Sequence, residues 1–190
     1  IRDAVKGHVF YMDELGFVNG AADRGEELKQ AVTCAKWAKS PMQSINYLSC
    51  HDNYTLWDRF IISNSHESEE MRIRMNKLAA AILFTAQGVP FFLHGEEFAR
   101  TKISEADGAP VENSYCSPLS VNAIDYDRAE QFSDLKAYYK GLITLRRAPK
   151  SFYLDTVDEI KKSVHFMDDM PDGVVAYTID NDTEKVFVAY

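Results

Sequence analysis

Residues 44–58 read SINYLSCHDNYTLWD, an apolar strand over about 44–50 that runs directly into hydrogen-bonding and acidic side chains. A helical segment follows, and residues 88–100, GVPFFLHGEEFAR, again place charged side chains after an apolar run. Ligands of α/β proteins bind outside the carboxyl ends of parallel strands. Two successive units of this kind predict an α/β fold with a polar rim where the two strands end.

The segments around these strands have helical periodicity. Apolar side chains recur at helical spacing over about 26–38, 69–87 and 132–147, and the middle segment has the clearest apolar stripe. The strand at 89–94 is apolar on both faces, which predicts a parallel strand covered on both sides. Between 101 and 133 the many Asn, Asp, Ser, Gly and Pro residues indicate a long ordered loop.

The sequence pattern changes from helical to β-type after Pro149. Short β-type runs at 164–167, 173–179 and 185–190 are separated by turns rich in Asp, Asn and Gly. We therefore predict a boundary near residue 150. Residues 1–150 form the α/β part, and residues 151–190 begin an antiparallel β domain.

Composition excludes several classes of protein. The chain has 190 residues, a net charge of -8 and 46% hydrophobic residues, so it can bury a core and is a poor partner for nucleic acid. No apolar run approaches the roughly 20 residues of a membrane span, and no secretory signal is visible at the start. The absence of an initiating Met suggests a piece of a longer protein. Three widely spaced cysteines, Cys34, Cys50 and Cys116, favour a reducing, cytoplasmic setting, although a secreted or cell-surface parent stays open.

The first polar cluster offers candidates for chemistry. Neighbouring strand residues point to opposite faces, so His51 and Asp52 can share a ligand only if the chain turns there, and Asn53 favours such a turn. An imidazole beside a carboxylate can bind vicinal hydroxyls, and the carboxylate can stabilise developing positive charge. From spacing alone, a role in capping local backbone groups is at least as good an interpretation.

The sequence motifs identify a protein family more specifically than the chemistry of His51 and Asp52 does. SCHDNYTLWD at 49–58 resembles the seventh-strand motif of type I pullulanases, the debranching members of the α-amylase superfamily, and QGVPFFLHGEEFARTK at 87–102 is similar to their eighth-strand segment. Further pieces agree in order. They are IRDAVKG at 1–7, GFVNG at 16–20, ENSY at 112–115, VNAID at 121–125 and LITLRR at 142–147. The likeness is dense over about 1–150.

The resemblance implies the C-terminal part of a (β/α)₈ TIM barrel, about strands seven and eight with their helices, followed by the start of a β-sandwich. It also implies retaining hydrolysis of α-1,6-glucosidic links in pullulan, glycogen or dextrins. By motif, Asp52 takes the role of transition-state stabiliser and His51 contacts a sugar hydroxyl. The motifs of the nucleophilic Asp and the acid Glu are absent, so we expect the chain by itself to be inactive.

The same rim supplies further substrate-binding candidates, and several of them have a structural alternative. They are Asn53, Tyr54, Trp57, Glu97, Asn113, Tyr115 and Asn122. The aromatic rings suit sugar faces, but Trp57 is about as well suited to a core. Glu97 could instead pair with Arg100 or Lys102. Turn chemistry alone explains many asparagines in loops.

The expected partner is an α-glucan, and neither nucleic acid nor a membrane is expected. Exposed strand edges also predict self-association. No motif here indicates a cofactor or a metal; calcium is conceivable only for a longer enzyme. Two alternatives stay open: a non-catalytic glucan-binding or structural module, and another superfamily activity such as isoamylase or amylopullulanase.

Overall fold

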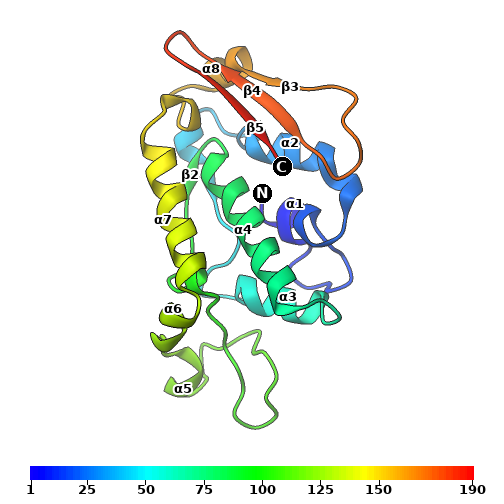
Figure 1. Cartoon of the computed structure of the whole chain (residues 1–190), viewed down its shortest axis with the longest axis vertical. Helices are drawn as coiled ribbons and strands as arrows, with labels where there is room; N and C mark the ends of the chain where they lie inside the picture. Colours follow the sequence, from blue (N-terminus) through cyan, green and yellow to red (C-terminus); the bar gives the residue numbers. More distant parts are fainter.

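The computed structural model describes all residues from 1 to 190 and has a mixed α/β fold (Figure 1). The helices are α1 Arg2–Lys6, α2 Gly25–Val32, α3 Leu56–Ser63, α4 Glu69–Thr85, α5 Leu119–Asn122, α6 Asp127–Gln131, α7 Ser133–Arg147 and α8 Val157–Ser163. The strands are β1 Ile45–Asn46, β2 Val89–Pro90, β3 Val164–Phe166, β4 Ala176–Asp180 and β5 Lys185–Ala189. No helix is both long and apolar enough to cross a bilayer.

The two predicted strands pair in parallel but are short. β1 and β2 pair Ile45 with Val89 and Asn46 with Pro90, and α3 and α4 connect them. The predicted strands over 44–50 and 89–94 are therefore shorter than expected, and the second is not covered on both faces, since Phe91 is 45% exposed. The sheet has only two strands, Pro90 has no N–H to donate, and Ile45 is 64% exposed.

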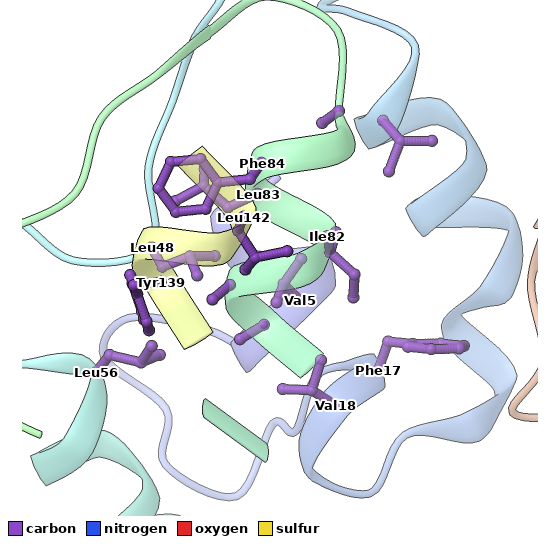
Figure 2. Packing of buried hydrophobic residues seen from close by; sticks show 14 of the residues in the cluster. Val5, Phe17, Val18, Leu48, Leu56, Ile82, Leu83, Phe84, Tyr139 and Leu142 are labelled. Atoms are coloured by element: carbon purple, nitrogen blue, oxygen red, sulfur yellow. The ribbon is translucent and has the colours of Figure 1, made fainter. Parts of the chain in front are cut away.

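Helices α4 and α7, both predicted from their apolar periodicity, pack against each other. The Ser68 side chain caps α4 by accepting a hydrogen bond from the Met71 N–H. Tyr139 of α7 lies against Phe84 of α4, with ring centroids 6.0 Å apart in an edge-to-face arrangement. Figure 2 shows this contact beside Leu83 and Leu142. The contact joins α4 to α7 within the buried hydrophobic cluster.

The end of α4 is held by a buried arginine. The Arg146 guanidinium donates to the carbonyls of Phe84, Ala86 and Gly88 at 2.7, 2.8 and 2.6 Å. The Phe84 carbonyl is one of the last four of the helix, which have no partner within it. Gly88 lies two residues beyond the cap residue Ala86 and has a φ of 101°. A Cβ at Gly88 would lie 2.6 Å from the Ser44 carbonyl oxygen, so β2 can pass β1 only with glycine there.

Two elements differ from the predictions made for helices. The helix predicted over 26–38 ends at Val32, because Cys34 has a φ of 108° that no helix accommodates. Helix α8 was not predicted, although Thr156 and Glu159 form a capping box at its start. The loop predicted over 101–133 also contains the short helices α5 and α6.

The predicted antiparallel strands are confirmed at the end of the chain. β3, β4 and β5 form one sheet in that order, with Val164 opposite Ile179 and Tyr177 opposite Val188. The boundary near residue 150 stays a prediction. One buried cluster includes Val5 and Leu83 as well as Ile179, so both parts share a core.

Candidate functional site

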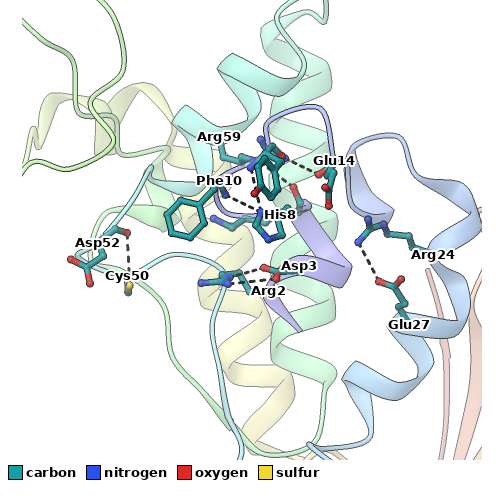
Figure 3. Close-up of polar contacts among 12 residues, drawn as sticks. Arg2, Asp3, His8, Phe10, Glu14, Arg24, Glu27, Cys50, Asp52 and Arg59 are labelled. Carbon is teal, nitrogen blue, oxygen red and sulfur yellow. Dashed lines mark hydrogen bonds and ion pairs between the residues drawn. The ribbon is translucent and has the colours of Figure 1, made fainter.

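His51 and Asp52 lie in the exposed loop that follows β1. Their side chains are 86% and 65% exposed, and His51 Nε2 lies 3.4 Å from Asp52 Oδ2. Asn53 has a φ of 59°, a left-handed conformation that asparagine tolerates better than most residues, so the chain turns here. Figure 3 shows the Asp52 carboxylate directed away from the ribbon, while its carbonyl faces the Cys50 thiol. Both polar groups are therefore accessible to a ligand from solvent.

Asn53 and Tyr54 connect this loop to the long polar loop. The Asn53 side-chain amide donates to Glu112 Oε1 at 3.5 Å. Burial raises the pKa of Tyr54, and the nearby charge of Glu112 raises it further. Both residues are half-buried, so they present only part of their side chains to a ligand.

Trp57 was predicted as a substrate-binding candidate, but the structure places it in the core. It is 4% exposed, and its ring packs edge-on against Phe132 at a centroid distance of 5.3 Å. Thr55 caps the start of α3 by accepting from the Asp58 N–H, and the helix then directs the indole into the core. Trp57 therefore stabilises the fold and cannot stack on a sugar in this conformation.

The two glutamates after β2 have different surroundings. Glu97 is half-buried and accepts a hydrogen bond from the Gly95 N–H at 2.9 Å. Neither predicted partner pairs with it, because Arg100 donates to the carbonyls of His94 and Asn122 and Lys102 forms no ion pair. Glu97 is thus partly accessible beside the rim.

Glu96 is buried and was missed by the sequence reasoning. Ser49 Oγ donates to its Oε2 at 2.5 Å, and the Tyr139 hydroxyl lies 3.4 Å from its Oε1. Burial raises its pKa to about 7, while the Ser49 hydrogen bond and the charge of Lys6 oppose the increase. Glu96 and Glu97 lie in one turn of 3₁₀ helix, in which adjacent side chains point in different directions, so one carboxylate is inside and the other is partly accessible.

The long polar loop presents two of its three candidates to solvent. Asn113 is exposed and Tyr115 is 83% exposed, whereas the Asn122 amide donates to the Ser114 carbonyl at 2.7 Å. Asn122 therefore holds residues 114–117, the turn before α5, and its amide is not free for a ligand. No group of three or more His, Cys, Asp or Glu side chains is arranged to hold a metal ion.

A second buried network, also missed from sequence, lies beneath the rim. Asp58 is fully buried and accepts from the Lys102 N–H at 2.9 Å and from the Thr101 hydroxyl. The Lys102 ammonium donates to the Ser114 hydroxyl at 2.7 Å and to the His51 carbonyl at 3.4 Å. This network joins α3, the segment after β2 and both polar loops.

Comparison with known proteins gives one consistent result. No protein-family model matches the chain. A pullulanase of Bacillus subtilis (strain 168) is 35% identical over 185 residues, which are 94% of this chain and 25% of the relative. A solved pullulanase from Bacillus acidopullulyticus superposes on the whole chain with a TM-score of 0.91 at 37% identity, and the match covers 23% of that structure.

A second solved structure agrees with the first. The pullulanase of Paenibacillus barengoltzii, in complex with maltohexaose and alpha-cyclodextrin, has a TM-score of 0.91 and is 39% identical over the whole of this chain, which covers 30% of that protein. The chain thus spans about a quarter of the length of the relatives it matches. The chain is a relative of the pullulanases and corresponds to one part of them.

Proposed function

We propose that the chain is the part of an α-1,6-debranching glycoside hydrolase that holds the sugar next to the cleaved bond. The accessible pair of His51 and Asp52 carries this proposal, because both side chains face solvent in the loop that follows β1. An ionised carboxylate there would stabilise the positive charge of an oxocarbenium-like transition state, and the imidazole would bind a neighbouring hydroxyl.

The fold assignment belongs to the same proposal. β1 and β2 are the seventh and eighth strands of a (β/α)₈ barrel, and β3 to β5 begin a β-sandwich. In support, β1 and β2 are parallel and joined through helices, and the candidate residues follow their carboxyl ends, where barrel enzymes place their sites.

The chain by itself would bind a glucan without hydrolysing it. Retaining hydrolysis needs a nucleophilic carboxylate and a carboxylic acid about 5–5.5 Å apart. Asp58 and Glu96, the buried carboxylates nearest the two strand ends in sequence, accept hydrogen bonds from Thr101 and Ser49 and are closed to solvent. Neither is free to attack a sugar.

The test is a titration of the chain with maltotetraose, followed by ¹H–¹⁵N NMR. Binding should shift the signals of His51, Asp52 and Tyr115. Asp52→Asn should weaken binding on the order of tenfold, since a hydrogen bond to a charged group is worth about 1.5–3 kcal/mol. Asp182→Asn, at an exposed position in the β4–β5 turn, is the matched control and should bind like the parent chain.

Two outcomes would contradict the proposal. One is a wild-type chain that shows no shifts in this loop, and the other is an Asp52→Asn variant that binds as tightly as the Asp182→Asn control. Release of reducing sugar from pullulan by the purified chain would contradict the proposal that the chain does not hydrolyse glucans by itself.

A further inference from the structure

Lys102 is a buried lysine whose ammonium is directed at the candidate site. It is 3% exposed, and a buried ammonium is costly unless its donors are satisfied. No carboxylate forms an ion pair with it. Its hydrogen bonds go instead to the His51 carbonyl at 3.4 Å and the Ser114 hydroxyl at 2.7 Å. One side chain therefore contacts both polar loops.

The backbone of Lys102 is itself held in place. Its N–H donates to the buried Asp58 carboxylate at 2.9 Å, and its carbonyl accepts from the Val111 N–H at 2.8 Å. The Thr101 hydroxyl donates to the same carboxylate. Because Asp58 lies in the first turn of α3, the ammonium is fixed relative to a helix that begins shortly after the His51–Asp52 loop.

A second, weaker link joins the same two loops. The Asn53 amide donates to Glu112 Oε1 at 3.5 Å. Asn113 and Tyr115 lie beside these contacts and are exposed. The two loops thus meet at Lys102 and Glu112, with accessible polar and aromatic groups on both.

We propose that Lys102 is a positioning residue that holds the His51–Asp52 loop against residues 111–117, so that Asp52 and Tyr115 meet the same glucan chain. Asp58 fixes the lysine, and the lysine fixes the loop. The inference rests on the proposed function, because the position of Asp52 matters for binding only if a glucan is bound there.

The first test needs no variant and no ligand. In the wild-type chain, the ¹⁵Nζ signal of Lys102 should be visible and slow to exchange, with contacts to His51 and Ser114, because its protons are buried and hydrogen-bonded. Lys136, an exposed lysine of α7, is the internal control. A Lys102 ammonium that exchanges as fast as that of Lys136 would overturn the proposal.

The second test removes the ammonium by Lys102→Met, with Lys136→Met as the matched control. We expect the backbone order parameters of Cys50 to Asn53 to fall from about 0.85 towards 0.6, values typical of rigid and flexible backbone. Those of α4 and α7 should not change. Lys102→Arg, which keeps a positive charge and several donors, should restore part of the order, which general core damage would not allow.

Maltotetraose binding separates this inference from the proposed function. If wild-type chain binds, Lys102→Met should weaken binding on the order of tenfold, and Lys136→Met should leave it unchanged. If wild-type chain does not bind, the proposed function fails, and the order parameters still decide whether the lysine fixes the loop. Unchanged order in a folded Lys102→Met variant overturns the inference; if that variant does not fold, the wild-type ammonium signal decides.

Discussion

Neighbouring polar residues in this chain differ in exposure, and their exposure decides whether they can contact a ligand. The motif at 49–58 contains Ser49 and Asp58, which are buried, and Asp52, which is exposed. The sequence alone does not say which of Asp52 and Asp58 is exposed, because the chain turns at Asn53 between them. The resemblance to known motifs directed attention to Asp52, and the contacts of Asp58 with Thr101 and Lys102 became visible only in three dimensions.

Glu96 should make stability depend on pH. Burial raises its pKa to about 7 in the folded chain, against 4.5 for an unperturbed glutamate. Between these values the unfolded state releases its proton first, so the free energy of unfolding falls as pH rises from about 4.5 to 7. At pH 8 the loss from this group is at most about 3 kcal/mol. Glu96→Gln cannot ionise and should be more stable than wild type at pH 8.

Urea unfolding at several pH values between 4.5 and 7.5 measures this effect. The difference between wild type and Glu96→Gln should grow with pH across that range, whereas Glu130→Gln, at an exposed position on α6, should follow wild type. Burial lowers the pKa of Lys6 to about 8, and the charge of Glu96 opposes this decrease, so the measurements stay below pH 7.5, where Lys6 of the wild type is mostly protonated. Parallel curves for wild type and Glu96→Gln would contradict the assignment.

At the scale of elements, length and capping decided what could be predicted. The helices α4 and α7 were predicted because long apolar stripes leave little ambiguity. Helix α8 is short, and its capping box at Thr156 and Glu159 was the only strong signal. The strands were predicted too long, because an apolar run reports burial whereas strand length depends on a hydrogen-bonding neighbour. Beyond β1 and β2 no neighbour is present.

The cap of α8 can be tested directly. Thr156 accepts from the Glu159 N–H at 3.1 Å, and the Glu159 carboxylate accepts from the Thr156 N–H at 3.1 Å. Thr156→Ala should lower the free energy of unfolding by about 1 kcal/mol, as loss of a threonine N-cap does. Thr144→Ala, at an exposed position in the last turn of α7, should leave the free energy of unfolding unchanged or slightly raised. Equal urea midpoints for the two variants would exclude a stabilising cap.

At the scale of the whole molecule, the core is shared but both sheets have edge strands with a partner on one side only. The buried cluster includes residues from α1 to β5, so the antiparallel sheet packs on the helices (Figure 1). The parallel sheet has two strands, and each has an edge without a partner. Sequence patterns predicted both sheets, but whether an apolar strand is covered depends on contacts that no local pattern encodes.

The open edge of β1 predicts self-association. Ile45 is 64% exposed and Trp37 is 73% exposed, and the two side chains line one hollow of about 340 Å³ with Tyr47. An unpaired edge beside exposed apolar side chains is a template for pairing with another chain. We therefore expect the weight-average mass measured by sedimentation to rise with protein concentration in the micromolar to submillimolar range.

Ile45→Lys should shift this rise to higher concentration, because a lysine at the edge opposes pairing. Phe187→Lys, at a 60% exposed position on β5, tests the other sheet and should associate like wild type. A chain that stays monomeric throughout, or an association that Phe187→Lys weakens and Ile45→Lys does not, would place the reactive edge elsewhere.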